Sequence, residues 1–173
     1  MRRVLVLGAS VIALTIAAVS PVAAAKPDHS RPGVGAPLVF AAGEMCDFAL
    51  TVSTSEVRSK TTTWEADDGT VRILDRGFAS GVATNTDDEV SLHQQGGYHI
   101  DVVIHPDGSV DVKASGVLVA FYFPGDPVEG LSSGAWAVRG HGTEHYAADG
   151  SLTSATFQGQ IIADLCHSLA PAA

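Results

Sequence analysis

Cysteine is scarce in this sequence, and basic residues are few. There are 2 cysteines in 173 residues, and 10 Lys and Arg stand against 19 Asp and Glu, which gives a formal net charge of −9 at pH 7. Such an acidic chain lacks the cationic footprint that nucleic acids and anionic membrane surfaces require. We therefore expect no nucleic acid among its partners, and we interpret the scattered acidic residues as a solubilising surface.

Long apolar runs are absent after the first 25 residues of the sequence. The run at residues 4–19 is shorter than the roughly 20 residues of a membrane-spanning helix. Arg2 and Arg3 precede this run, and three alanines ending at Ala25 follow it. This order predicts a signal peptide over residues 1–25 that is cleaved near Ala25. We expect a protein secreted to the cell envelope or beyond, without stable membrane insertion. An uncleaved anchor is the less favoured alternative.

The rest of the chain divides into a linker and one domain. Residues 26–37 are rich in Pro and Gly and lack apolar periodicity, which predicts a flexible linker. Residues 38–169 have the length of a single domain. Cys46 and Cys166 lie near the two ends of this domain, and an even pair in an exported protein predicts a disulfide. A catalytic or metal-binding role is less favoured, because neither cysteine belongs to a recognisable ligand motif.

Alternation with a period of two indicates strands throughout the domain. Three Asp-Gly pairs, each followed by a hydroxyl residue, separate strand-like segments and predict three hairpins. In the middle hairpin, a three-residue loop sets Val102 opposite Val112 and Asp101 opposite Lys113. The glycines of the three pairs are Gly69, Gly108 and Gly150.

Glycines inside the strand-like segments indicate a bent or closed sheet. The predicted fold is all-β, an antiparallel meander that closes into a small barrel of about eight to ten strands. A β-sandwich is the alternative. The interior glycines are Gly81, Gly116, Gly140, Gly142 and Gly159. The expected strands are residues 47–54, 57–64, 70–76, 78–84, 90–94, 98–105, 110–122, 135–146 and 152–162.

Recognisable catalytic and cofactor motifs are absent from the sequence. No Gly-x-Ser-x-Gly elbow and no phosphate-cradling or dinucleotide motif occurs, so no catalytic residue and no cofactor is predicted. His141 and His145 are four residues apart, but in a strand this spacing separates them by roughly 13 Å, too far to share one ion. No metal site is therefore predicted.

Aromatic residues supply the one set suited to lining a pocket. An eight-stranded barrel is near the size at which the interior either fills or holds one small ligand. Core packing is the alternative fate for these side chains. The candidate pocket residues are Trp64, Tyr98, Phe121, Tyr122, Trp136 and Phe157.

Short motifs at the two ends of the domain carry a resemblance to a known group. The domain starts with Gly43-x-x-Cys46-Asp47-Phe48 and finishes with Asp164-Leu165-Cys166-x-x-Leu169. In these motifs the chain resembles small secreted actinobacterial proteins of uncharacterised function. The resemblance implies a β-rich domain with a disulfide, and it implies no catalytic residue.

Three functions fit these observations. The favoured hypothesis is a secreted β-barrel module that binds a small, mainly apolar molecule. The second is a barrel-type enzyme, such as an isomerase, cyclase or hydrolase, that pairs one of its histidines with an acid; His93, His99, His141 and His145 are the candidates. The third is an envelope-associated interaction protein. The sequence leaves the oligomeric state undetermined.

Overall fold

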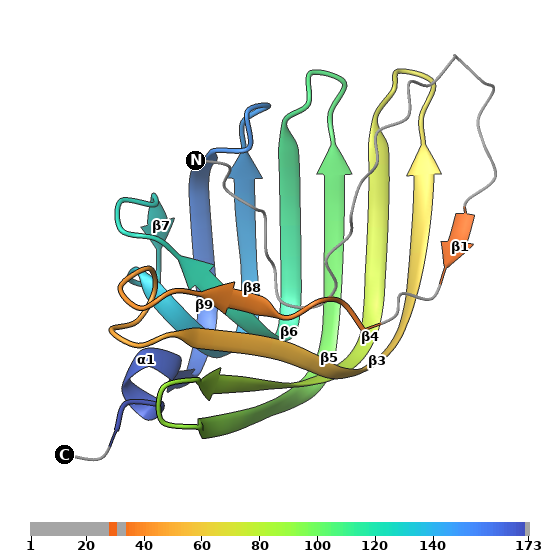
Figure 1. Cartoon of the computed structure of the whole chain (residues 1–173). Helices are drawn as coiled ribbons and strands as arrows, with labels where there is room; N and C mark the ends of the chain where they lie inside the picture. The colour runs from red at the N-terminus through yellow and green to blue at the C-terminus, as the bar shows by residue number, and fades with distance from the viewer. Residues whose placement is uncertain (1–27, 31–33, 172–173) are drawn as a thin grey trace.

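The segments in which apolar and polar residues alternate form long strands, and these strands pair into one sheet (Figure 1). The computed structural model describes residues 28–30 and 34–171, so the predicted signal peptide lies outside the described residues. The long strands are β3 (Leu50–Glu65), β4 (Val71–Asn85), β5 (Val90–Ile104), β6 (Val110–Tyr122), β8 (Gly134–Tyr146) and β9 (Leu152–Asp164). The short elements are β1 (Asp28–Ser30), β2 (Leu38–Phe40), β7 (Val128–Glu129) and the helix α1 (Leu165–Ser168).

The sheet remains open. Its strand order is β1-β3-β4-β5-β6-β8-β9-β7, with β2 paired to β3 off this path. Within the described residues, the two ends of this order do not pair with each other. The all-β class is confirmed, whereas the predicted closure into a barrel is not found. Figure 1 shows instead a sheet whose lower half bends sharply across the front.

The three predicted hairpins are present, and the middle one has the expected register. Val102 pairs with Val112, and Tyr146 pairs with Leu152. In each turn the aspartate accepts a hydrogen bond of 2.9 Å from the backbone N–H two residues further on. The following glycine adopts a positive φ. Local turn chemistry therefore fixes these three strand pairs.

The strands are longer than the sequence predicts. Breaks were expected near residues 55–56, 77 and 95–97, yet β3, β4 and β5 continue through them for 16, 15 and 15 residues. In β3, a register shift between Thr54 and Glu56 marks a β-bulge. The polar and glycine residues that interrupt the alternation therefore bend the strands instead of ending them.

Four glycines and Tyr98, which lies between the first two of them, occupy one line of paired positions across the sheet, and we call these four glycines the glycine row. A Cβ atom on Gly116 would lie 2.2 Å from the carbonyl oxygen of Gly97, and one on Gly140 would lie 2.2 Å from that of Gln158. Only residues without a side chain permit such close approach of neighbouring strands. The row therefore marks the line along which the sheet bends. Its members are Gly77, Gly116, Gly140 and Gly159.

At the glycine row the sheet divides into two leaves. β5 pairs with β6 only through residues 98–104 and 110–116. Beyond this point, the rest of β5 stays with β4 and the rest of β6 stays with β8. The front leaf comprises residues 50–58, 78–85 and 90–97, and the back leaf comprises residues 117–122, 134–139 and 160–164. Figure 1 shows the front leaf crossing in front of the back leaf.

The two leaves pack against each other and are joined at their ends. Leu50 of the front leaf shares one buried cluster with Ala135 and Ala137 of the back leaf, and Leu165 of α1 belongs to the same cluster. The small alanine side chains allow the two layers to approach closely. The predicted disulfide is confirmed, because Cys46 before β3 bonds to Cys166 in α1, with 5.2 Å between their Cα atoms.

Part of the predicted linker at residues 26–37 belongs to the sheet. Asp28–Ser30 form β1, which pairs antiparallel with residues 61–63 of β3. This pairing covers part of the outer edge of β3. None of the helices within residues 28–30 and 34–171 is long and apolar enough to cross a membrane.

Candidate functional site

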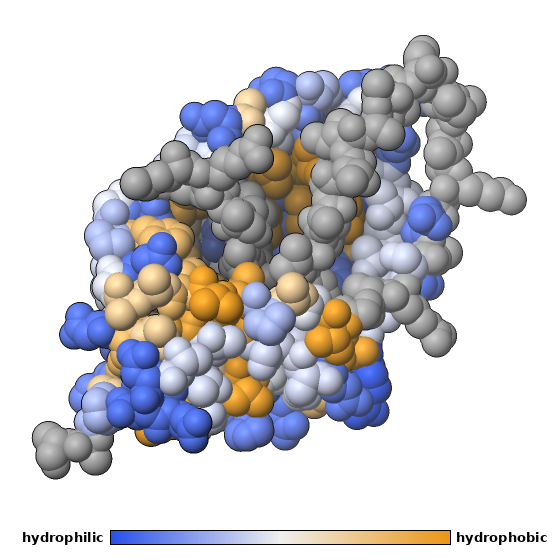
Figure 2. Space-filling model, viewed as in Figure 1, coloured by the Kyte–Doolittle hydropathy of each residue, from blue (hydrophilic) through white to orange (hydrophobic). Residues whose placement is uncertain are grey.

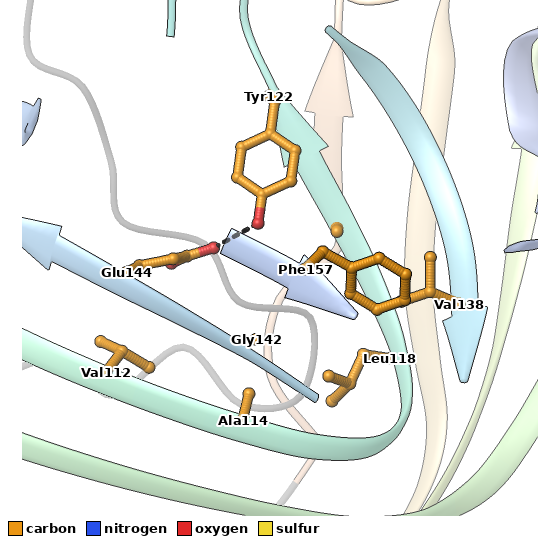
Figure 3. A pocket seen from close by; sticks show the side chains of 9 residues that line it. Val112, Ala114, Leu118, Tyr122, Val138, Gly142, Glu144 and Phe157 are labelled. Atoms are coloured by element: carbon orange, nitrogen blue, oxygen red, sulfur yellow. Dashed lines mark hydrogen bonds between the residues drawn. The ribbon is translucent and has the colours of Figure 1, made fainter. Parts of the chain in front are cut away.

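A cavity lies in the bend, between the back leaf and the part of β6 and β8 beyond the glycine row (Figure 3). Its enclosed volume is about 20 Å³, which is room for about one water molecule. Ala114 and Gly142 stand opposite each other in the register, and their small size leaves the hollow. Figure 2 shows hydrophobic residues gathered where the upright strands meet the front leaf. The lining residues are Val112, Ala114, Leu118, Ala120, Tyr122, Val138, Gly142, Glu144 and Phe157.

Glu144 provides the carboxyl group in this otherwise apolar wall. It is 6% exposed. Its Oε1 accepts a hydrogen bond of 2.9 Å from the hydroxyl of Tyr122, and its Oε2 accepts one of 2.6 Å from the hydroxyl of Tyr146. Tyr122 belongs to the back leaf and Glu144 lies on the other side of the glycine row, so their hydrogen bond spans the bend (Figure 3).

Burial sets the protonation of this group. Desolvation raises the pKa of Glu144 above its ordinary value of 4.5, although the hydrogen bonds from the two tyrosines oppose the change. Desolvation and the nearby Glu144 charge also raise the pKa of Tyr122 and of Tyr146. The tyrosine hydroxyls therefore remain donors, and Glu144 holds its proton to a higher pH than an exposed glutamate does.

Replacing Glu144 by Gln is expected to remove a pH-dependent loss of stability. Because the pKa of Glu144 is higher in the folded state, its protonated form stabilises the fold below about pH 4.5, and this contribution is lost as the pH rises through the folded-state pKa. Glu144→Gln stays neutral, so its stability relative to the natural chain should increase with pH. Urea unfolding from about pH 4 to about pH 8 measures this difference. Glu65→Gln, which removes an exposed carboxyl group, is the control, and a constant difference for Glu144→Gln across this pH range would contradict the prediction.

A second buried carboxyl group lies on the same face, nearer to β3. Asp75 is 4% exposed and accepts hydrogen bonds from Thr61 at 3.1 Å and from Tyr98 at 3.0 Å. Burial is the main cause that raises the pKa of Tyr98 to about 12. The Ser59 hydroxyl is buried beside Tyr98. Glu144, in contrast to Asp75, lines the cavity described above.

The structure places four of the six predicted pocket residues on the face that bears the cavity. Tyr122 and Phe157 line the cavity. Tyr98 belongs to the same apolar cluster as Phe157, and Trp136 packs against that cluster. The indole N–H of Trp136 donates a hydrogen bond of 2.9 Å to the carbonyl oxygen of Ser132.

The other two predicted residues lie on the opposite face. Phe121 faces the front leaf and packs against Phe40, with 4.9 Å between the ring centroids. Trp64 is three residues beyond Thr61, so strand alternation turns it away from the side that carries Asp75. Neither residue lines the cavity.

Sequence reasoning missed Glu144 and Tyr146. His141 and His145 were considered as metal ligands, but Glu144 lies on the opposite face of the same strand from these two histidines. The signal lay in the registers, because Val110 pairs with Tyr146, and Val112 pairs with Glu144. A glutamate at an inward position among valines marks a buried carboxyl group.

On the outer face of the sheet, His105 and His145 form hydrogen bonds with the carboxylate of Asp111. His105 Nε2 lies 3.0 Å from one oxygen of Asp111, and His145 Nδ1 lies 2.5 Å from the other. These hydrogen bonds, first that of His105, lower the pKa of Asp111. The three side chains are 38–51% exposed. Within the ranges that the structure describes, no group of three or more His, Cys, Asp and Glu side chains is arranged to hold a metal ion.

Comparison with protein-family models, with curated proteins and with solved structures finds no match for this chain. Its function is therefore inferred from its own residues. The cavity beside Glu144 shares an apolar lining and a polar anchor with small-molecule sites, but its volume of about 20 Å³ is far smaller than theirs.

Proposed function

We propose that this chain is an exported binding module for a small, mainly apolar molecule that carries a hydroxyl group. The observation that carries the proposal is the buried Glu144 carboxyl group, which faces an apolar cavity between two tyrosine hydroxyls. Apolar ligand sites use a few such polar groups to fix the orientation of the ligand. The two tyrosines each occupy one oxygen of Glu144, and each carboxyl oxygen can accept a further hydrogen bond from a ligand.

The small volume of the cavity limits which part of the ligand can enter it. A space of about 20 Å³ admits a group of about the size of one water molecule, which is the size of a hydroxyl. The apolar body of the ligand then lies outside this space, because the lining residues Val112 and Leu118 are only 1% and 7% exposed. A hydroxyl group both donates and accepts hydrogen bonds, so it matches Glu144 in either protonation state.

The proposal is tested with n-octanol as the probe and octyl methyl ether as the matched molecule without a hydroxyl donor. The protein is purified without detergent, and binding is followed by NMR through the backbone amide signal of Gly142. The alcohol should bind at least tenfold more tightly than the ether, because the ether cannot donate a hydrogen bond to Glu144. Equal affinity for both, or no binding of either, would overturn the proposal.

Ala114→Leu is expected to abolish binding of n-octanol by filling the hollow. Ala114 lines the cavity, and a larger side chain there occupies the space that the hydroxyl needs. Ala66→Leu makes the same change at an exposed turn and should leave the affinity unchanged. Both variants must first show cooperative urea unfolding. A folded Ala114→Leu variant that binds n-octanol normally would place the ligand elsewhere.

One observation favours acid–base catalysis as a second function of the same site. Because the pKa of Glu144 is raised, this residue, beside the hydroxyl of Tyr122, holds a transferable proton next to the cavity to a higher pH than an exposed glutamate does. Mass spectrometry of an organic extract of the purified protein would identify the natural ligand. Conversion of that ligand by the natural chain, lost in Glu144→Gln, would support catalysis, and an unchanged ligand would exclude it.

A further inference from the structure

The two edges of the sheet differ in how they are protected. Along β3, β2 pairs with residues 50–52 and β1 pairs with residues 61–63. The stretch between them contains a β-bulge and the exposed charged residues Glu56, Arg58 and Lys60. Short covering strands, bulges and charges are the devices that prevent an edge strand from pairing with another chain.

In the part of the chain that the structure describes, the outer edge of β9 has little of this protection. β7 pairs with it only at Ala155 and Thr156. Residues 158–162 are all exposed, and no charged residue occurs between Leu152 and Ala163. Ile161 and Ile162 are 47% and 42% exposed. A register shift beside Ile162 bends the far end of the strand, so the regular unprotected backbone covers residues 158–161.

We infer that this edge of β9 pairs with β9 of a second copy of the chain to form a twofold-symmetric dimer. Antiparallel pairing of one strand with its own copy is self-complementary about a twofold axis. A second copy also carries a net charge of −9, and the uncharged β9 edge is a surface where the repulsion between two acidic chains is weak. The contact is short, so the dimer dissociates reversibly.

The side chains of β9 specify the register of this dimer. With the twofold axis at Gln160, Ile161 of one copy lies opposite Gly159 of the other. Both residues belong to the same face of the sheet, since Gly159 pairs with Gly140 and Ile161 pairs with Val138. The isoleucine then covers a glycine backbone that has no side chain of its own. Such cross-strand contacts stabilise a strand pair.

Sedimentation equilibrium of the natural chain and two lysine variants tests the dimer. The natural chain should show a monomer–dimer equilibrium that strengthens with added salt, because salt screens the repulsion between the copies. Ile161→Lys should weaken the dimer at least tenfold, because it places like charges close to the axis. Val39→Lys is the matched control, since Val39 is 69% exposed on β2, and it should dimerise like the natural chain.

Circular dichroism and urea unfolding establish that both variants are folded. A natural chain that stays monomeric at every concentration overturns the inference. An Ile161→Lys variant that dimerises normally also overturns it, because the interface would then lie elsewhere. Binding of n-octanol does not depend on this edge, so it should be the same in Ile161→Lys and in the natural chain.

Discussion

Removing the Cys46–Cys166 disulfide is expected to lower the free energy of unfolding by about 5 kcal/mol. The two cysteines are 120 residues apart in the sequence, and cross-linking so long a loop removes much of the conformational entropy of the unfolded chain. The bond also joins the segment before β3 to the helix after β9. Urea unfolding of the double variant Cys46→Ala/Cys166→Ala, compared with the natural chain, measures the loss.

A reducing agent provides the control for this experiment. Reductant should destabilise the natural chain by a similar amount and leave the double variant unaffected. A loss below about 2 kcal/mol in both experiments would contradict the chain-entropy explanation, because it would mean that the unfolded chain is already restricted without the bond.

Replacing Gly116 by Ala is expected to lower the free energy of unfolding by about 4 kcal/mol or more. Gly116 has a φ of 110°, and its added Cβ would lie 2.2 Å from the carbonyl oxygen of Gly97. Both the backbone conformation and the separation of the leaves would have to change. Because this glycine lies at the bend, a folded variant should also bind n-octanol less tightly. Urea unfolding and the NMR titration measure the two effects.

Gly125→Ala separates the two causes. Gly125 has a φ of 89° with no atom within 4 Å of an added Cβ, so its substitution introduces the conformational strain alone. We expect this variant to lose about 1–2 kcal/mol. Equal losses in Gly116→Ala and Gly125→Ala would show that close packing at the glycine row contributes little to the fold.

Local chemistry made the hairpins predictable. An aspartate whose side chain binds the backbone two residues on, followed by a glycine at positive φ, specifies a turn from four or five adjacent residues. Once Gly108 fixes the turn, Val102 and Val112 must pair. Nothing distant in the chain has to be known for this step.

The openness of the sheet was not predictable in the same way. Glycines such as Gly116 indicated that the strands bend, but the degree of the bend depends on packing between distant segments. β5 and β6 part at residues 98 and 116, because the separated leaves bury Leu50 against Ala135. Such contacts join residues far apart in the sequence, so strand periodicity alone does not reveal them.

The structure separates the candidate pocket residues between two faces for a related reason. The back leaf is packed on both faces, since Tyr122 lines the cavity and Phe121 packs towards the front leaf. A strand buried on both sides loses the alternation that would tell its faces apart. The sequence therefore grouped the two aromatic residues, and the structure separates them.

The position of the disulfide has a consequence for proteolysis. The three Asp-Gly turns expose Asp68, Asp107 and Asp149, and exposed turns are the sites where proteases cut folded domains first. All three turns lie between Cys46 and Cys166. A single cut in any of them leaves two fragments that remain covalently joined and still paired within one sheet. A nicked molecule therefore keeps its mass apart from one added water, and its fragments separate only after reduction and denaturation.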